Sequence, residues 1–227
     1  MKVITLVHVT PAGAEPLGRD DSHALAHGLA LAANGAATLT AVLAGAATDT
    51  APLRKALEAG AGRAVRVVGD DLAGADFHTL GQVLAAGIKR LGADLVLAGA
   101  RSDDDGIGAV PAATARQLGF VYVSAVEEIA RTDAPSAIEV VVRGGGRKRR
   151  LRVTLPAVLS IVAGPRAPVA PPTPAAASPA IEVVSLADPE RTVVRRRTEL
   201  LGMAEPASRG AETVTSSAAL IAALTKP

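Results

Sequence analysis

A glycine-rich polar loop at positions 101–109 is the part of the sequence best suited to bind a ligand. It has the sequence RSDDDGIGA, follows the apolar run ADLVLAG and precedes a stretch with helical periodicity. At the start of a helix the backbone N–H groups lack intrahelical partners and the helix dipole is positive, so an anion is favoured there. We therefore expect a phosphate to bind at the N–H groups of Gly106, Ile107, Gly108 and Ala109. Glycines after a strand are also frequent as simple turn residues, so the loop alone is a weak signal.

Three consecutive carboxylates, Asp103, Asp104 and Asp105, stand in the same loop. Acidic side chains before a helix commonly cap its positive end, and that is the more frequent role. In a nucleotide-binding fold such a residue can also accept a hydrogen bond from a ribose hydroxyl or bind a metal. A metal site would need further oxygen ligands from other strands, and none stands out, so we assign no metal.

Further ligand-binding positions are expected where other apolar runs end. In an open parallel sheet the ligand binds outside the carboxyl ends of the strands, at the point where the strand order reverses. A glycine there would let the backbone approach a ligand closely. A lone histidine at a strand end is more often a hydrogen-bonded structural residue than a catalyst. The residues that we expect at this edge, besides the loop residues above, are His8, Ala44, Gly45, Gly99, Ala100, Arg101 and Ser102.

No catalytic group is defensible from the sequence. The chain has no cysteine, which excludes disulfides, thiol nucleophiles, cysteine-bound zinc and iron–sulfur clusters. His23 and His27 are four residues apart and share a helix face, but no third metal ligand accompanies them, so a solvated face is the better interpretation. Neither a Ser-His-Asp arrangement nor a pair of catalytic carboxylates is present. We expect no bond-making catalysis, and any redox role must use a bound cofactor.

Charge and hydropathy give no indication of nucleic acid or of a membrane. The formal net charge is +2, and the basic runs at 147–150 and 195–197 are more typical of solvated or partner-contacting surfaces. The apolar N-terminal run is too short to span a bilayer and lacks a small-residue cleavage site. These features predict a cytoplasmic protein without membrane insertion.

Alternating apolar runs and helical patterns predict the elements that position these residues. Hydrophobic residues make up 49% of the chain, which is enough for a core, and only three residues are aromatic: Phe77, Phe120 and Tyr122. We expect Asp20, Asp21 and Ser22 to cap the first helix, and Phe77 to lie on the inner face of the third. The pattern predicts a doubly wound, mostly parallel α/β sheet. The expected strands are 3–9, 37–45, 64–68, 94–99 and 120–126, and the expected helices are about 20–35, 53–57, 75–91 and 109–118.

After about residue 126 the sequence no longer alternates between strand and helix patterns. The segments EEIA, IEVVVRGGGRKRRLRVTL and AVLSIV predict further strands of the same sheet, with a hairpin turn at Gly144, Gly145 and Gly146. Residues 164–179 are rich in Pro and Ala and predict an extended arm. A further strand and a short terminal helix follow, and we expect them to lie outside the main sheet, against a second subunit. The predicted organisation is an α/β nucleotide-binding domain at 1–163 and a partner-binding segment at 164–227.

The order of these features resembles the β subunit of electron-transfer flavoproteins. The similarity is strongest in ADLVLAG followed by SDDDGIGAVP, in the hairpin and in LPAVLSIV, and weaker in LTAVLAG and LRKALEAGAGRAVRV. The resemblance implies a sheet of the adenine-nucleotide α-hydrolase-like or Rossmann-like type. It also implies a heterodimer: the α subunit holds most of the FAD, and the β subunit binds AMP or, in bifurcating members, a second FAD. Such pairs carry electrons from a dehydrogenase to an acceptor, and the C-terminal arm wraps the α subunit.

The sequence departs from the family pattern in three places. Gly106, Ile107 and Gly108 replace a loop that usually carries side-chain donors, and Gly18-Arg19-Asp20 replaces Asn-Pro-Phe. The arm APVAPPTPAAAS lacks the leucine anchor used to recognise dehydrogenases. The resemblance therefore indicates a divergent member with an unusual or dedicated partner. Two alternatives remain: an adenine-nucleotide sensor of the universal-stress type that acts alone, and a scaffold subunit that binds no nucleotide.

Overall fold

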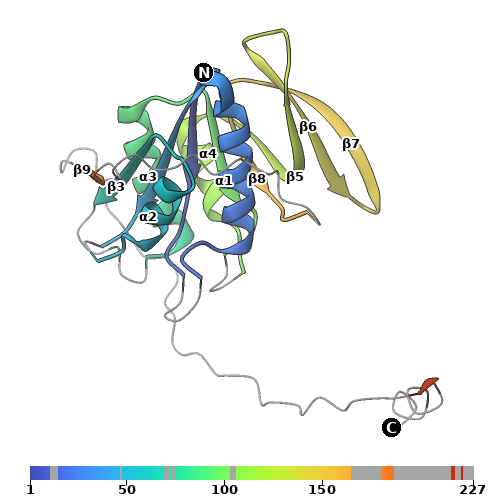
Figure 1. The fold of residues 1–227 in the computed structure, drawn as a ribbon, viewed down its shortest axis with the longest axis horizontal. Helices are drawn as coiled ribbons and strands as arrows, with labels where there is room; N and C mark the ends of the chain where they lie inside the picture. The colour runs from blue at the N-terminus through green and yellow to red at the C-terminus, as the bar shows by residue number, and fades with distance from the viewer. Residues whose placement is uncertain are drawn as a thin grey trace.

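The computed structural model describes residues 1–10, 15–46, 48–68, 72, 75–102, 106–164, 180–186, 216–217 and 221. Within them the chain forms one nine-stranded sheet in the order β7-β6-β5-β8-β4-β1-β2-β3-β9. Figure 1 shows helices on both sides of the parallel part and the β6–β7 hairpin standing beside α1. The predicted α/β class and the single, mostly parallel sheet are confirmed.

The elements alternate along the first part of the chain, as the sequence pattern predicts. The described strands and helices are β1 (Lys2–Leu6), α1 (Arg19–Ala32) with a 3-10 turn (Ala33–Gly35), β2 (Thr38–Ala44), α2 (Ala51–Glu58), β3 (Arg63–Val68), α3 (Phe77–Leu91), β4 (Leu95–Gly99), α4 (Val110–Leu118), β5 (Val121–Arg131), β6 (Ala137–Gly144), β7 (Arg147–Thr154), β8 (Ala157–Ile161) and β9 (Glu182–Ser185). No helix among these described elements is long and apolar enough to cross a membrane.

Two apolar cores hold the layers together, one on each face of the sheet. Leu25 of α1 and Leu53 of α2 pack with inward-facing residues such as Leu43 on one face. On the other face, Leu84 and Ile88 of α3 pack against the sheet. Phe77 does not join this core, although the sequence predicted it there. It is 42% exposed, because it is the first residue of α3 and lies at the helix end rather than over the sheet.

Strand β5 joins the parallel and the antiparallel parts of the sheet. Its first half pairs in parallel with β8 and its second half pairs antiparallel with β6, with irregular register between Val123 and Val126. Ala125, within this irregular stretch, has a φ of 56°, the left-handed conformation that L-residues rarely adopt. The expected separate strands FVYVSAV and EEIA are thus one continuous strand, and the prediction of two was wrong. This irregular stretch lies where β5 changes from parallel pairing with β8 to antiparallel pairing with β6.

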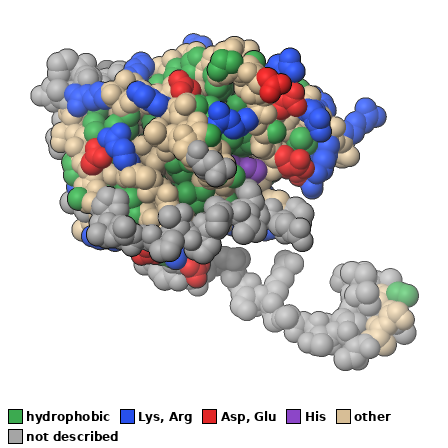
Figure 2. Space-filling model, turned by 45° about the horizontal axis from the view of Figure 1, so that its top comes forward, with side chains coloured by type: hydrophobic (Ala, Val, Ile, Leu, Met, Phe, Trp, Pro, Cys, Tyr) green, Lys and Arg blue, Asp and Glu red, His purple; other side chains and the backbone are tan. Residues whose placement is uncertain are grey.

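The β6–β7 hairpin is confirmed at the predicted position. Gly145 and Gly146 form its two-residue loop with φ values of 58° and 71°, the left-handed geometry that tight hairpins need. Figure 2 shows Lys and Arg side chains mixed with acidic ones on the side where the hairpin lies. Glu127 of β5 pairs with Arg143 and with Lys148, the latter at 3.0 Å, so part of the basic run is neutralised by its own sheet. The side chains of Arg143 and Lys148 hold the pKa of Glu127 below its usual value, the hydrogen bond from Lys148 contributing most.

Strand β9 occupies a place that the sequence did not predict. It pairs in parallel with β3 and forms an edge of the main sheet, where Arg63 donates two hydrogen bonds to Glu182 at 2.9 and 2.7 Å. The expectation that this strand lies outside the sheet was wrong, because a four-residue strand after a Pro-rich segment carries no signal for its partner. The arm at 165–179 and most of the terminal helix lie outside the described residues. The boundary at 163/164 stays a prediction.

Candidate functional site

The strand order reverses between β1 and β4, which places the expected ligand edge there. β1 pairs with β2 on one side and with β4 on the other, all in parallel. His8 follows the end of β1 by two residues, and Gly99 is the last residue of β4. The structure therefore brings His8, Gly99 and Ala100 to one edge, as predicted. In open α/β sheets this crevice outside the carboxyl ends is the usual ligand position.

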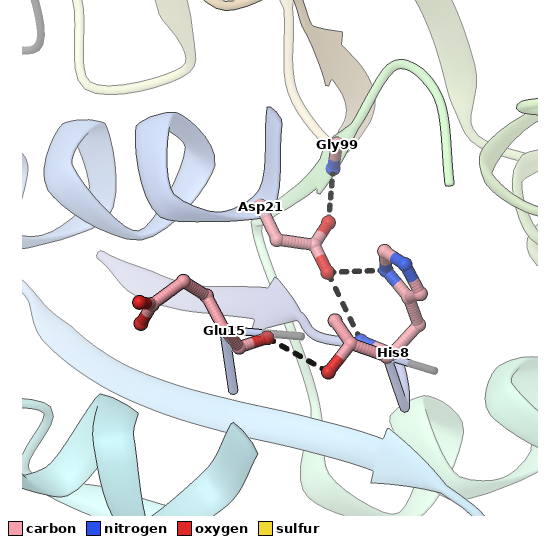
Figure 3. A network of polar contacts seen from close by, with 5 residues as sticks. His8, Glu15, Asp21 and Gly99 are labelled. Atoms are coloured by element: carbon pink, nitrogen blue, oxygen red, sulfur yellow. Dashed lines mark hydrogen bonds and ion pairs between the residues drawn. The ribbon is translucent and has the colours of Figure 1, made fainter. Parts of the chain in front are cut away.

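The Asp21 carboxylate accepts hydrogen bonds from residues at the ends of both β1 and β4. One carboxylate oxygen, Oδ1, accepts a hydrogen bond from the Gly99 backbone N–H at 3.0 Å. The other, Oδ2, accepts from the His8 backbone N–H at 3.0 Å and contacts the His8 ring nitrogen Nδ1 at 2.5 Å. Figure 3 shows Asp21 reaching from the start of α1 toward both strands. The side chain of Asp21 is 5% exposed and that of His8 is 28% exposed, so a buried carboxylate orients a partly accessible imidazole.

The neighbouring Asp20 joins the start of α1 to the end of β8 by a hydrogen bond. Its Oδ1 accepts from the Ala163 backbone N–H at 2.8 Å, just past the end of β8. Its Oδ2 is buried and has no hydrogen-bond donor among the described residues, and Arg101 Nε lies 3.9 Å from it. Asp20 is only 7% exposed, whereas the Arg101 side chain is 72% exposed. A buried carboxylate with one unpaired oxygen is costly to keep unless something compensates its charge.

The predicted capping role of Asp20, Asp21 and Ser22 is wrong. The N-cap of α1 is Gly18, and the helix start has no side-chain cap hydrogen bond. Asp20 and Asp21 lie within the first turn, and their carboxylates reach outward to neighbouring strands. These two residues belong to the candidate site, and the sequence analysis missed them because an acid before an apolar helix is usually a cap. Two adjacent acids opposite predicted strand ends were the available signal.

The glycines at the strand ends differ in how closely protein atoms surround them. A Cβ on Gly99 would overlap Asp21 Oδ1, and a Cβ on Gly45 would come within 2.9 Å of Asp49 Oδ2. Gly45 and Ala44 follow β2 on the far side of β1, where the Ala46 N–H donates to Asp49 Oδ2 at 2.8 Å. Gly99 also lies against the backbone of Asp20 and Asp21, so packing accounts for this glycine, whereas the atoms nearest a Cβ on Gly45 belong to the side chains of Leu43 and Asp49. Their predicted role in ligand approach stays a prediction.

The loop after β4 has two glycines with the same backbone geometry and different surroundings. Gly106 and Gly108 have φ values of 66° and 61°. A Cβ on Gly108 would overlap the Ala100 carbonyl oxygen, whereas a Cβ on Gly106 would meet no atom of the described residues within 4 Å. Ile107 between them is 62% exposed. Gly108 therefore packs directly against the backbone that follows β4, whereas Gly106 has no such contact with the described residues.

Helix α4 begins directly after this loop, and among the described residues no side chain caps its positive end. Ala109 is its N-cap, and its first turn holds no acidic residue. Ser102 follows Arg101 in the loop before α4. The three aspartates of this loop, Asp103, Asp104 and Asp105, lie outside the described residues. The start of α1, in contrast, holds two carboxylates. Of these two helix starts at the ligand edge, α4 offers the more favourable environment for an anion.

The interpretation of His23 and His27 as a solvated face is wrong for His27, because its side chain is buried against β5, whereas His23 is partly exposed. His27 is buried and hydrogen-bonds to the backbone of Glu127, which joins α1 to β5. Burial lowers its pKa below the usual value, so the ring is neutral near pH 7. The pKa of His23 is also lowered, chiefly by burial. Among the described residues no group of three His, Asp or Glu side chains is placed to hold a metal ion.

The donor and acceptor set at this edge fits a nucleotide. The uncapped start of α4 suits a phosphate, and the exposed Arg101 adds a cation beside it. Asp20 supplies the orphaned buried carboxylate oxygen described above. His8, held by Asp21, adds a polar side chain at the end of β1. The arrangement can bind and orient a ligand. Among the described residues, no nucleophile with an adjacent base completes a catalytic group.

Comparison with known proteins finds similarity to one protein family. The family model described as the electron transfer flavoprotein domain matches residues 7–189. An electron transfer flavoprotein subunit beta from Methylophilus methylotrophus is 34% identical over 142 residues, which cover 60% of this chain and 53% of that protein. The subunit beta from Mycobacterium tuberculosis (strain CDC 1551 / Oshkosh) is 34% identical over 130 residues, 55% and 46% of the two chains.

A third relative carries a different name. Protein FixA from Azorhizobium caulinodans is 30% identical over 148 residues, which cover 63% of this chain and 53% of that protein. The matched segments thus span about half the length of each of these relatives.

Proposed function

Because the chain belongs to the β-subunit family of electron transfer flavoproteins, whose domain model matches residues 7–189, we propose that it is the β-type subunit of such a pair. In this role it binds an α subunit and helps to hold that subunit's FAD in place. The pair carries electrons from a dehydrogenase to an acceptor in the cytoplasm. The chain contributes binding and orientation and has no bond-making catalysis of its own. The domain match is the observation that carries the proposal.

The β pocket of this proposal is the edge formed by His8, Gly99, Arg101 and the start of α4. The phosphate of AMP, or of a second FAD, binds at the N–H groups of Gly106 to Ala109, because α4 starts there without a side-chain cap. Ala44 and Gly45 at the end of β2 border the same edge and face the base or ribose. A bound flavin would supply the redox chemistry. The protein groups fix the position of the nucleotide and of the partner's cofactor.

The proposal is tested by analysing the nucleotides that the purified pair releases. The full chain is co-expressed with an α-type subunit, the complex is denatured, and released AMP and FAD are quantified. One FAD and one AMP per pair supports a β pocket that holds AMP, and two FAD supports a bifurcating type. One FAD without a second nucleotide makes the chain a scaffold subunit. A colourless monomer that binds ATP would refute the proposal and favour a sensor of the universal-stress type.

The control for this experiment is a loop variant. Gly108→Val adds a side chain where a Cβ already overlaps the Ala100 carbonyl, so it distorts the loop before α4. Gly119→Val is the matched control, because it adds the same side chain at a similar φ of 72°, at the C-cap of α4 outside the loop, where no described atom lies within 4 Å. If the loop binds the phosphate, the first variant releases less AMP per pair than the second, while FAD in the α subunit is unchanged.

A further inference from the structure

The two helix starts at the ligand edge differ in charge. In dinucleotide-binding sheets the pyrophosphate rests on the start of the helix that follows the first strand, because its N–H groups and dipole attract negative charge. Here that helix is α1, and its first turn carries Asp20 and Asp21, both less than 10% exposed. The carboxylates oppose the helix dipole with full charges, so the start of α1 repels an anion.

The negative charge of Asp20 has fewer hydrogen-bond donors around it than that of Asp21. Asp21 accepts from three N–H groups, including both backbone donors of the neighbouring strands. Asp20 accepts only from Ala163 among the described residues, and its Oδ2 has no hydrogen-bond donor there. The nearest described cation, Arg101 Nε, is 3.9 Å away on a largely exposed side chain and is screened by solvent. A buried carboxylate acts on its surroundings through its field, so no direct contact with the ligand is needed.

We propose that Asp20 makes the β pocket selective for a nucleoside monophosphate over ligands with a pyrophosphate, because its buried charge repels further phosphate at the start of α1. This inference rests on the nucleotide pocket proposed above. A monophosphate is accommodated at the start of α4, where no acidic side chain lies in the first turn. The added negative charge of ADP, or of the FAD pyrophosphate, has no second favourable helix start, since α1 is occupied by its own carboxylates. Asp20 is a specificity-determining residue in this account.

The experiment compares affinities for AMP, ADP and FAD by calorimetry on the full chain. The wild type is expected to bind AMP at least tenfold more tightly than ADP or FAD. Asp20→Asn is nearly isosteric and keeps an oxygen to accept from Ala163 N–H, so the fold is retained while the charge is removed. We expect the AMP-to-ADP affinity ratio to fall about tenfold in this variant, the size of a unit-charge interaction near a protein surface. Asp133→Asn removes an exposed charge in the β5–β6 turn and leaves the ratio unchanged.

Each outcome separates this inference from the function on which it rests. If the wild type binds AMP and the ratio is the same in Asp20→Asn, the inference is wrong and the pocket stands. If the wild type binds AMP and ADP equally, the inference is also wrong. If neither protein binds any of the three nucleotides, the proposed pocket fails and the inference falls with it. Asp20→Ser serves as a second uncharged variant, so poor folding of the asparagine variant does not decide the result.

Discussion

Replacing Asp21 with alanine should destabilise the fold through loss of the tie between β1 and β4. The variant leaves the Gly99 N–H without its acceptor in a buried position, and it removes the two contacts to His8. Leaving a buried donor unsatisfied costs about 1–3 kcal/mol, and a hydrogen bond to a charged group contributes about 1.5–3 kcal/mol. Because part of the His8 contribution is solvent-exposed, we expect a total loss of roughly 3–5 kcal/mol.

Urea unfolding measures this loss directly. With a denaturant slope of about 2 kcal/mol per molar, the midpoint should fall by roughly 1.5–2.5 M. Asp21→Asn keeps one acceptor oxygen, so it should lose about half as much. Asp133→Ala at the exposed β5–β6 turn is the control and should move the midpoint little. A shift below about 0.5 M for Asp21→Ala would show that the carboxylate does not join the strands as described.

Three further predictions test separate parts of the fold. Gly106→Ala should cost about 1–2 kcal/mol for a left-handed alanine, whereas Gly108→Ala should cost clearly more in the same urea assay because of its backbone overlap; equal losses would contradict the loop geometry. Since burial lowers the pKa of His27, the native chain binds fewer protons than the unfolded chain below about pH 6.5; unfolding free energy should therefore fall from pH 7 to 5, and less so in His27→Gln. Arg63 and Glu182 are half-exposed, so a double-mutant cycle should give about 0.5 kcal/mol, and a value above about 2 kcal/mol would contradict a surface pair.

The parallel sheet was predictable from the sequence because its signals are local. Buried strands such as LVLAG are short apolar runs, and helices such as α3 show regular apolar spacing ended by Gly92, so each element identifies itself. The hairpin was predictable for the same reason, since Gly145 and Gly146 mark a tight turn.

The features that were missed depend on contacts between distant residues. β9 pairs with β3 across more than 100 positions, and nothing in its four residues names that partner. Asp20 and Asp21 reach Ala163 and Gly99, which lie far along the chain, and the presence of two adjacent acids did not identify these partners. The left-handed conformation of Ala125 is one that alanine rarely adopts, so the residue type gives no signal for it. Local patterns therefore predicted the strands whose ends meet at this edge, whereas the carboxylates that join these ends required the structure.

The central claim is that this chain is the β-type partner of a flavin-carrying subunit. The most direct test is to co-express it with an α-type subunit and follow flavin absorbance through size-exclusion chromatography. The account predicts one yellow peak that contains both chains in equal amounts, whose flavin is bleached on reduction and recovers on oxidation. If the α-type subunit elutes folded and yellow while this chain elutes separately and colourless, the account is contradicted.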